Sequence, residues 1–386
     1  MKKTILYWSP CLNKIGTVIS TINSAIAMSK YCKNDYYIKI VNVFGEWNEH
    51  KIYFSDNNIE VIDLNFNYYN FLPKKGYLQS RFSYIVIFLL SFFPMLKIIR
   101  RTKPNFIIAH LITSLPLTLL MLFSLNTKFI LRISGHPKLN FFRKLFWKKV
   151  SKKLHLVTCP TKELLEKINE LKIFESSKTF FLPDAIISVK DFKIKKKFTF
   201  DNSIKIENKK IILAAGRLTR QKNFSYLIKE FLEFSKNNEE YILLILGDGE
   251  ERKNLENIIK QNNLENKVFL PGYKEDVYRY MKKSNVFVLS SLWEEVGFVM
   301  VEAAINNLYI IASDCPNGPI EFLNQGKNGI LFKNNVKNEL CKSLFEYNKL
   351  TKDKIFFDKL ELKKNSKKYT KFRHFMELNK ILKFDV

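Results

Sequence analysis

The sequence predicts an α/β protein built from two doubly wound parallel sheets, and three observations favour this class. The chain has 386 residues, which is more than one ordinary hydrophobic core uses. Short runs dense in Ile, Val, Leu and Phe alternate with helix-length segments almost from end to end. These runs lack the strict polar–apolar alternation of half-exposed strands. Such a pattern is typical of parallel sheets that helices cover on both faces.

The alternation occurs twice, and a charged passage separates the two halves. In the first half the runs predicted as strands are 4–10, 37–44, 59–64, 105–111, 128–134 and 154–160. In the second half they are 210–215, 241–246, 267–270, 286–290, 309–313 and 329–332. We therefore expect the following parts: an N-terminal domain over 1–190, a Lys-rich linker over 191–208, a C-terminal domain over 209–365, and a helical stretch over 366–386 that is a candidate to return to the first domain. In open α/β sheets ligands bind outside the carboxyl ends of the strands, so a cleft between two facing domains is the expected site.

The composition is globular and strongly basic. Hydrophobic residues make up 46% and charged residues 26%, and the formal net charge is +27. Such a surplus favours anionic partners: nucleic acid, phosphorylated ligands or an acidic membrane surface. The five cysteines are scattered and form no CxxC pair. This argues against a disulfide framework or a zinc site and suits a reducing cytoplasm. The apolar run at the N-terminus stops at Ser9-Pro10, which is too early for a signal peptide.

The most apolar stretch of the chain is 84–99, which contains Pro94 and is followed by Arg100 and Arg101. A helix that spans a membrane needs about 20 apolar residues, so this stretch is too short. One interpretation is a buried helix of the N-terminal domain. The other is a helix in the membrane interface, with its aromatic face in lipid and its basic end on anionic headgroups.

Two loops at strand ends of the second half carry cations or glycines suited to a nucleotide. Gly216 follows the strand 210–215, and Arg217 and Lys222 lie on the loop after it. An arginine can bind a diphosphate through two parallel N–H groups, and a lysine can bind it through a compact positive charge. Gly272 and Tyr273 follow the strand 267–270, where open backbone can approach a flat ligand such as a nucleobase. Taken alone, the first loop is better explained as a solvated basic turn, and the second is about as well explained as an ordinary turn.

The segment 290–304 is the most informative, because two glutamates flank the start of a helix. Glu294 lies on the loop before the helix and Glu302 lies about a turn and a half into it. Gly297 lets a phosphate approach the helix N-terminus, where the dipole favours negative charge. The amides proposed to meet that phosphate are those of Phe298, Val299 and Met300. Glu302 sits among apolar residues, where a bare acid is costly, so it is expected to bind the vicinal hydroxyls of a ribose.

At these residues the sequence resembles the retaining glycosyltransferases of family 4, which have the GT-B fold of two facing Rossmann-like domains. Members carry two glutamates separated by seven residues, as Glu294 and Glu302 are here. The loop with Gly216 and Lys222 resembles the phosphate-binding loop of the family. The stretch 313–329 resembles members that build bacterial surface polysaccharides such as lipopolysaccharide, capsule or exopolysaccharide. The likeness is strong over about 211–332 and thinner before that.

The resemblance implies a role for each residue that matches the family's motifs. Arg217 and Lys222 would hold the diphosphate of a sugar nucleotide, with UDP as the expected nucleotide. Glu302 would hold the ribose and Glu294 the donor sugar. The family transfers with retention and without a metal, and the chain contains no Asp-x-Asp motif. The expected partners are a nucleotide sugar and a lipid-linked or polysaccharide acceptor. The expected place of action is the cytoplasmic face of an anionic cell membrane.

The first half departs from the family pattern at two places. Members usually carry a pair of glycines after the first strand, whereas this chain has only Gly16. His136 follows the strand 128–134 but is displaced from the position where His-Gly is usual. His110 ends the preceding strand and is the alternative candidate. Both histidines are candidates to orient the acceptor or the donor sugar, although a lone histidine at a strand end is more often structural.

Three other interpretations stay open at this point. A nucleotide-sugar epimerase of the same fold would need no acceptor. A basic nucleic-acid- or membrane-binding protein without activity fits the charge. We nevertheless expect no nucleic-acid partner, because the chain lacks zinc-finger spacing and an aromatic-interleaved RNA motif. The third interpretation is an inactive accessory protein of the same family. It is suggested by the loop after the first strand, which has one glycine in place of the usual pair.

Overall fold

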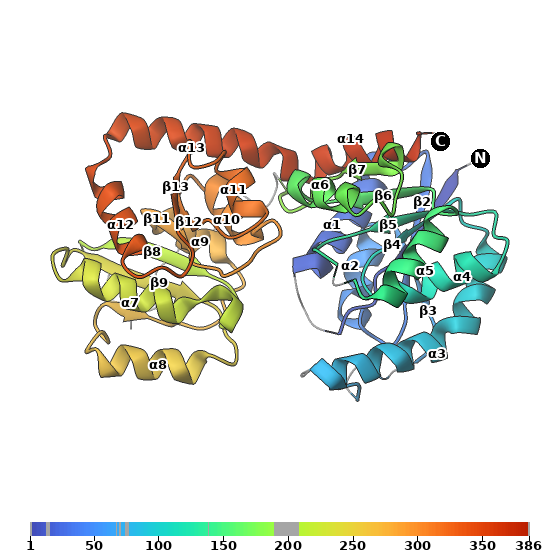
Figure 1. Cartoon of the computed structure of the whole chain (residues 1–386), viewed down its shortest axis with the longest axis horizontal. Helices are drawn as coiled ribbons and strands as arrows, with labels where there is room; N and C mark the ends of the chain where they lie inside the picture. Colours follow the sequence, from blue (N-terminus) through green and yellow to red (C-terminus); the bar gives the residue numbers. More distant parts are fainter. Residues whose placement is uncertain are drawn as a thin grey trace. The chain divides into compact units, whose positions relative to one another are not determined.

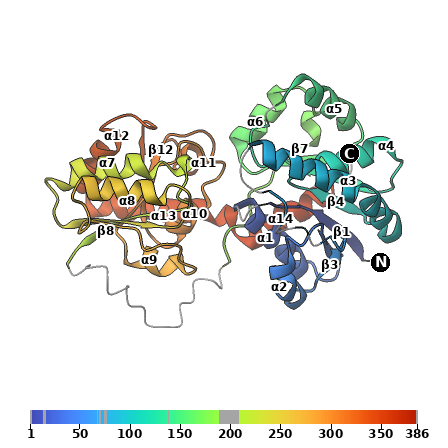
Figure 2. The same ribbon diagram turned by 90° about the horizontal axis from the view of Figure 1, so that it is seen from below.

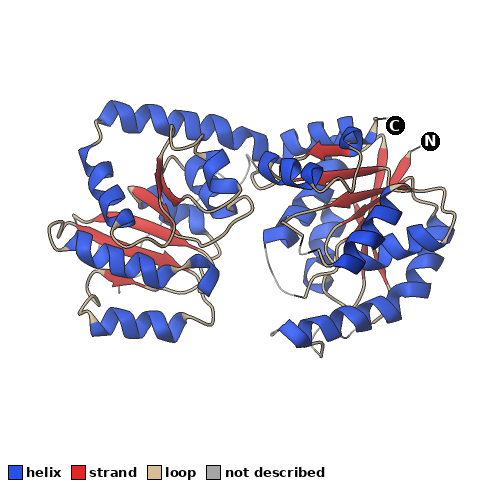
Figure 3. Cartoon of the chain, in the orientation of Figure 1, coloured by secondary structure: helices blue, strands red, loops and turns tan. Residues whose placement is uncertain are grey.

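The computed structural model describes residues 2–12, 16–66, 68, 71–73, 77–137, 139–188 and 208–384. The chain forms two compact units, the first made of Met1–Ile186 and Tyr369–Val386 and the second of Ile187–Lys368. Each unit has a parallel sheet with helices on both sides (Figures 1 and 3). The predicted α/β class with two parallel sheets is therefore confirmed. The predicted linker 191–208 lies, apart from its last residue, outside the described residues.

The sheet of the first unit has the strand order β3-β2-β1-β4-β5-β6-β7, and the paired strands are all parallel. The strands are β1 (Lys3–Trp8), β2 (Tyr36–Asn42), β3 (Ile59–Asp63), β4 (Phe106–Ala109), β5 (Lys128–Arg132), β6 (Leu156–Cys159) and β7 (Thr179–Phe181). In the centre, Ile5 of β1 pairs with Ile38 on one side and with Phe106 on the other. Strand β7 was not among the runs predicted from the sequence.

Helices cover both faces of this sheet, and each face has its own core (Figure 2). One face carries α1 (Gly16–Tyr31), α2 (Lys51–Asp56) and α14 (Lys371–Leu382). The other carries α3 (Tyr77–Thr102), α4 (Ser114–Leu122), α5 (Phe141–Ser151) and α6 (Lys162–Glu170). Short 3₁₀ turns occur at Asn48–His50 and Ser176–Lys178.

Helix α14 is the last element of the chain, yet it packs against α1 of the first unit. Its residues Phe375, Leu378 and Leu382 are buried in the same core as Ile22 and Ile26 of α1. The backbone N–H of Ile186 donates to the carbonyl of Tyr369 at 2.8 Å. This hydrogen bond joins the residue at which the first part of this unit ends to the residue at which the chain re-enters it. The stretch 366–386, which was a candidate to return, thus supplies part of the first core.

Helix α3 contains the most apolar stretch of the sequence, and it continues through Pro94. Among the described residues, one segment, Arg81–Thr102 of this helix, is long and apolar enough to cross a membrane by length and composition. One side of the helix packs into the core through residues such as Ile87 and Met95. The other side is exposed and equally apolar. Helix α3 is therefore packed into the core on one side, as the buried-helix interpretation expects. Its other side is an exposed apolar surface, as the membrane-interface interpretation expects.

The second unit repeats the topology with the order β10-β9-β8-β11-β12-β13. Its strands are β8 (Lys210–Ala215), β9 (Tyr241–Leu246), β10 (Val268–Phe269), β11 (Val286–Leu289), β12 (Tyr309–Ser313) and β13 (Ile330–Phe332). One face is covered by α7 (Phe224–Ser235), α8 (Arg252–Gln261) and α12 (Glu339–Lys349). The other side carries α9 (Val277–Lys283), α10 (Phe298–Ile305) and α13 (Lys352–Ser366), while α11 (Gly318–Phe322) follows β12. Figure 2 shows these two layers. A 3₁₀ turn, Lys367–Tyr369, follows α13.

In both sheets the strand order reverses at the centre, between β1 and β4 and between β8 and β11. The loops that leave the carboxyl ends of such a central pair diverge to opposite faces of the sheet and leave a crevice between them. Arg217 and Glu294 follow β8 and β11, whereas Gly16 and His110 follow β1 and β4. The topology therefore puts residues that the sequence singled out at the reversal point of each sheet.

Candidate active site

The loops after β8 and β9 meet backbone to backbone, and only glycine permits this. A Cβ atom added to Gly247 would lie 1.8 Å from the carbonyl oxygen of Gly216. The N–H of Leu218 donates to the carbonyl of Asp248 at 2.9 Å, which holds the two loops together. The glycines of these turns therefore fix the position of the β8 loop, on which the predicted cations lie.

Lys222 reaches back across the end of β8. It closes the 3₁₀ turn Arg220–Lys222, after which Asn223 adopts a left-handed conformation (φ 52°) and α7 begins. A Cβ atom on Gly216 would lie 2.9 Å from Cε of Lys222, so the bare backbone at Gly216 leaves room for the lysine side chain. The side chain of Arg217, on the same loop, is exposed.

Lys222 and Glu294 form an ion pair through Nζ and Oε1. The Ser291 hydroxyl donates to the same carboxylate oxygen at 2.7 Å. Glu294 is buried, and a buried carboxylate is tolerated when a cation and a hydrogen-bond donor satisfy it. The structure thus joins two residues that the sequence placed in one site from segments about seventy positions apart.

The loops after β8 and β11 are also joined through the backbone. The Ser290 hydroxyl donates to the carbonyl of Lys222 at 2.8 Å, and the N–H of Leu292 donates to the carbonyl of Gln221 at 2.8 Å. The hydroxyl of Ser313, at the end of β12, donates to the carbonyl of Ser291 at 2.7 Å. These contacts hold the Lys222–Glu294 pair from three adjacent strand ends.

The turn that leads into α10 is packed tightly from outside. A Cβ atom on Gly318, the first residue of α11, would lie 2.5 Å from the carbonyl oxygens of both Glu295 and Val296. The amide of Asn317 donates to the carbonyl of Glu294 at 3.4 Å. The sequence analysis assigned no role to Asn317 or Gly318, although both lie in the stretch that resembles the family. The structure shows that they support the Glu294 turn.

Gly297 precedes α10 in the left-handed conformation (φ 74°, ψ 61°), which an L side chain adopts only at a cost. The N–H of Met300 donates to the carbonyl of Gly297 at 2.9 Å. The expectation that Met300 offers its amide to a phosphate is therefore wrong, because the first turn of the helix already uses this group. The amides of Phe298 and Val299 come before that bond and remain the candidates, as at any helix start.

Glu302 lies further along α10 and is half-buried. Its neighbours Val301 and Ala303 are fully buried, which agrees with the apolar setting inferred from the sequence. Its carboxylate accepts a hydrogen bond from the hydroxyl of Tyr278 on α9 at 3.3 Å. The acid therefore has a polar neighbour on α9 and is partly exposed.

The turn after β10 holds the two residues proposed for the nucleobase side. The carbonyl of Gly272 accepts from the N–H of Gly247 at 3.0 Å, so this turn joins the same set of strand-end loops. The ring of Tyr273 is 76% exposed. The structure therefore brings Gly272 to the edge of the site and leaves the tyrosine ring in solvent.

In the first unit, Gly16 and His136 lie on the surface. Gly16 is the first residue of α1 and is exposed, while residues 13–15 of the same loop lie outside the described residues. His136 follows β5 and is exposed. Both positions are accessible to a ligand, as a role in orienting a substrate requires.

His110 is placed differently, inside the first unit. It is buried, and both ring nitrogens have partners: Nδ1 contacts the Thr21 hydroxyl at 3.0 Å and Nε2 contacts the Ser134 hydroxyl. Burial lowers the pKa of His110 to about 3, with a further lowering by the nearby Arg132 cation. The imidazole is thus neutral and engaged on both sides. Its contact with Ser134 braces the loop that carries His136, which is a structural role.

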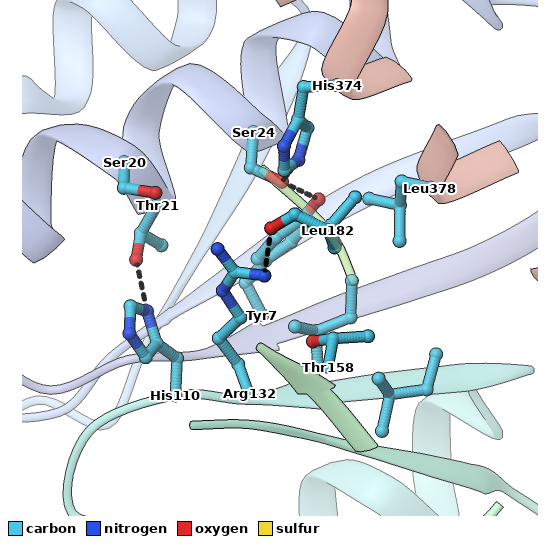
Figure 4. A pocket seen from close by; sticks show the side chains of 12 residues that line it. Tyr7, Ser20, Thr21, Ser24, His110, Arg132, Thr158, Leu182, His374 and Leu378 are labelled. Carbon is cyan, nitrogen blue, oxygen red and sulfur yellow. Dashed lines mark hydrogen bonds between the residues drawn. The ribbon is translucent and has the colours of Figure 1, made fainter. Parts of the chain in front are cut away.

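A buried polar network surrounds His110 (Figure 4), and most of its members were not among the residues predicted from the sequence. Arg132 donates to Asp184 Oδ1 at 2.6 Å and to the carbonyl of Leu182 at 2.7 Å. Arg132 and the Ser20 hydroxyl hold the pKa of Asp184 below its usual range against the effect of burial. His374 of α14 contacts the Pro183 carbonyl at 2.6 Å. The network therefore joins β5, α1, the segment after β7 and α14, which no local pattern reveals.

His110, Arg132 and His374 of this network are among the residues that line a cavity of about 20 Å³ (Figure 4). Within the described part of the chain, the Thr158 hydroxyl on its wall is buried without a hydrogen-bond partner. A space of this size holds about one water molecule. The cavity is therefore a place for internal hydration of the network and is too small for a sugar.

Comparisons with known proteins agree with the architecture. Residues 195–370 match the model of a family described as Glycosyl transferases group 1. The matched region contains β8 to β13 and with them Lys222, Glu294 and Glu302.

Two relatives show how far the likeness in sequence extends. An uncharacterized glycosyltransferase of Methanocaldococcus jannaschii is 31% identical over 258 residues, which are 60% of this chain and 61% of the relative. The N-acetylgalactosamine-N,N'-diacetylbacillosaminyl-diphospho-undecaprenol 4-alpha-N-acetylgalactosaminyltransferase of Campylobacter jejuni is 30% identical over 172 residues, 42% of this chain and 46% of the relative. The matches thus span less than two thirds of the length of these relatives.

The likeness in structure covers nearly the whole chain. The crystal structure of Anabaena HepE in complex with UDP and glucose superposes with a TM-score of 0.73 over 99% of both chains, at 14% sequence identity. At this identity the superposition speaks for the fold alone. It confirms the GT-B fold that the resemblance implied.

Proposed function

We propose that this chain, whose residues 195–370 match the family model described as Glycosyl transferases group 1, is a retaining glycosyltransferase of bacterial cell-surface glycan synthesis. It moves a sugar from a UDP-sugar to a lipid-linked or polysaccharide acceptor, without a metal, at the cytoplasmic face of the membrane. The observation that carries the proposal is the Lys222–Glu294 pair at the reversal point of the second sheet. Glu294 of this pair lies on the same strand–loop–helix segment as the start of α10 and Glu302.

The relatives support the choice of substrates. The name of the Campylobacter protein describes transfer to a diphospho-undecaprenol-linked glycan, and the Anabaena structure holds UDP and glucose. A basic chain suits both a diphosphate donor and an acceptor on an anionic surface. These likenesses favour UDP and a lipid-linked acceptor for this chain.

The proposed chemistry uses charge already arranged around the donor. The bond between the anomeric carbon and the diphosphate breaks, and the growing negative charge is stabilised by Lys222, Arg217 and the first amides of α10. Lysine has three N–H donors, so Lys222 can keep its bond to Glu294 while it binds phosphate. The acceptor oxygen attacks from the same face of the sugar, and its proton passes to the departing phosphate oxygen. No side chain forms a covalent intermediate in this scheme.

The test begins with donor binding, measured by calorimetry against UDP- and GDP-sugars with and without EDTA. Arg217→Ala is expected to weaken binding of the UDP-sugar by roughly tenfold, which is the loss of a charged hydrogen bond. Arg220→Ala is the matched control, since Arg220 is an exposed arginine three positions along the same loop. Its binding should stay within about twofold of the wild type.

Transfer is then measured with the preferred donor. Glu302→Gln is expected to lower kcat/KM by at least about a hundredfold, because it replaces one of the two acceptor oxygens with an NH2 group, which cannot accept a hydrogen bond from a ribose hydroxyl. Product analysis by NMR should show retention at the anomeric carbon. Conversion of the donor to an isomer without acceptor would instead indicate an epimerase. Equal effects of Arg217→Ala and Arg220→Ala would contradict the assigned donor site.

A further inference from the structure

A continuous part of the first unit carries no negative charge. Residues 64–162 contain neither Asp nor Glu, so all 37 acidic residues of the chain lie outside this segment. Lys and Arg recur through it. The segment includes α3, α4 and α5, which pack in succession on one face of the sheet. The charged residues of α3, α4 and α5 are therefore all cations, whereas α6 on the same face carries glutamates.

The outward side of α3 is apolar. Phe82, Ile85, Leu89 and Phe93 recur at the spacing of one helix face, and each is more than half exposed. The opposite side is buried in the core. An ordinary surface helix carries polar residues on its outward side, so an apolar stripe of this length indicates something that covers it. The stripe ends at the cation Arg100, which lies over the ring of Phe123.

Helix α5 repeats the same chemistry at its N-terminus. Phe141 and Phe142, which open the helix, are 76% and 78% exposed, and they are among the most exposed large apolar side chains described. Lys144, Lys148 and Lys149 follow them and are also exposed. Exposed aromatic rings followed by lysines are typical of elements that enter the headgroup region of an anionic bilayer.

We propose that the outward sides of α3 and α5 form a docking face that inserts into an anionic lipid bilayer. The docking face comprises the stripe Phe82, Ile85, Leu89 and Phe93, the pair Phe141–Phe142 and the adjoining cations. The proposal rests on the proposed function for its setting, a lipid-linked acceptor, and it names the surface that meets the membrane. Helix α3 lies along the bilayer and does not cross it, because a crossing would pull Ile87 and Met95 out of the core.

The charges argue for lipid over a second copy of the chain. In a symmetric dimer the same patch faces itself, so this docking face would set lysine against lysine with no acid to balance them. Anionic headgroups offer the opposite charge, and the acyl region takes the aromatic rings. A single occupant thus satisfies both properties of the face.

The experiment measures co-sedimentation of the full chain with vesicles of phosphatidylcholine, alone or with about one third phosphatidylglycerol. Binding is expected only with phosphatidylglycerol and should fall as salt is added. Phe141→Ser combined with Phe142→Ser should lower the vesicle partition coefficient by about tenfold or more, because two large apolar side chains are lost. Leu89→Ser combined with Phe93→Ser should act in the same direction.

The matched control is Phe356→Ser combined with Phe357→Ser. This pair is also adjacent and more than half exposed, but it lies on α13, where Asp353 and Glu361 accompany the lysines. Its vesicle binding should equal that of the wild type. Unchanged thermal unfolding and unchanged UDP-sugar binding would show that the α5 variant is folded.

Three outcomes would overturn the proposal: no binding of the wild type to anionic vesicles, an equal loss in the control, or a dimer in solution that the α5 variant dissociates. Failure here is distinguishable from failure of the proposed function. If the protein transfers sugar to a soluble acceptor but does not bind vesicles, only the proposal of the docking face is refuted. If it binds vesicles but no sugar nucleotide, only the proposal of a transferase is refuted.

Discussion

Two buried histidines of the first unit, His110 and His374, are held in their neutral forms. Burial lowers their pKa values to about 3 and about 4, against an ordinary value of 6.5. His374 lies between the carbonyl of Pro183 and the Ser24 hydroxyl. Between the folded and the unfolded pKa, the unfolded chain binds a proton that the folded chain excludes. Each histidine therefore stabilises the fold fully above pH 6.5 and loses this contribution as the pH falls.

We expect each histidine to lower the free energy of unfolding of the first unit by about 1.4 kcal/mol for every unit by which the pH is lowered between pH 6.5 and pH 4. His374→Gln removes one of the two groups, so its free energy of unfolding should fall less steeply by about that amount. Denaturant titrations at pH 7, 6 and 5, followed by tryptophan fluorescence, measure the difference. Parallel curves for the two proteins would contradict the buried neutral state of His374.

Glu46 acts with the opposite sign. Burial raises its pKa to about 7 even though the amides of Val43 and Phe44 donate to its carboxylate. The folded chain holds a proton there that the unfolded chain has lost, so the contribution of Glu46 declines as the pH rises towards 7. Because it is present in both proteins, it cancels in the comparison with His374→Gln.

Among the elements, α10 depends on the backbone conformation of the glycine before it. Gly297 has φ 74°, and the nearest atom to a Cβ atom there would be Cε of Met300 at 3.4 Å. Gly326 has a similar φ of 85°, and a Cβ atom there would be in ordinary contact with Leu331 at 3.8 Å. Alanine costs about 1–2 kcal/mol at either position, because both require the left-handed region. Alanine therefore has the same backbone cost at both positions. Gly297 lies beside the proposed donor site in the sequence, whereas Gly326 lies further along the chain.

Gly297→Ala is expected to weaken binding of the UDP-sugar severalfold, because the methyl group stands where phosphate is proposed to approach the helix amides. Gly326→Ala should lower the melting temperature by a similar amount and leave binding unchanged. Calorimetric titration and thermal unfolding of both variants measure the two effects. A loss of affinity in both variants would show that the effect is one of stability.

The strands could be predicted from the sequence where the chain is continuously buried. The bounds of β8, β9 and β12 match the runs predicted from sequence, because each is an unbroken apolar run between polar turns. Strand β7 gave no such signal. The Glu294 turn was readable for a related reason, since its chemistry lies within fifteen consecutive residues. Its supports from Ser313 and Gly318 come from neighbouring strand ends and needed the fold.

The network around Arg132 could not be predicted. Its members come from β5, α1, the segment after β7 and α14, so nothing in the local sequence links them. The same holds for His110: at a strand end it resembles a site residue, and only the contacts with Thr21 and Ser134 show that it is buried structure. Burial depends on tertiary packing, which a single sequence does not record.

At the scale of the whole molecule, the first unit is completed by a segment from the other end of the chain. Helix α14 contributes Phe375, Leu378 and Leu382 to the core that contains β1 and α1. Three of the four tryptophans, Trp8, Trp47 and Trp147, are buried in this unit, whereas Trp293 of the second unit is half exposed. Tryptophan fluorescence therefore reports mainly on the first unit.

Truncation after residue 368 is expected to destabilise the first unit by more than about 4 kcal/mol, since several buried apolar side chains and the His374 contacts are lost together. The tryptophan fluorescence transition should shift to lower denaturant or disappear. The second unit keeps all its strands and should retain a cooperative transition by circular dichroism. An unchanged fluorescence transition would show that α14 is dispensable for the first core.

The return of α14 has a consequence for the order of synthesis. A growing chain leaves the ribosome from its N-terminus, so 187–368 are available before Tyr369–Val386, which the first unit requires. The domain encoded second is therefore the first that can close its core. Until α14 has been synthesised, the nascent first unit lacks the helix that packs against α1, while the second unit already has all its strands.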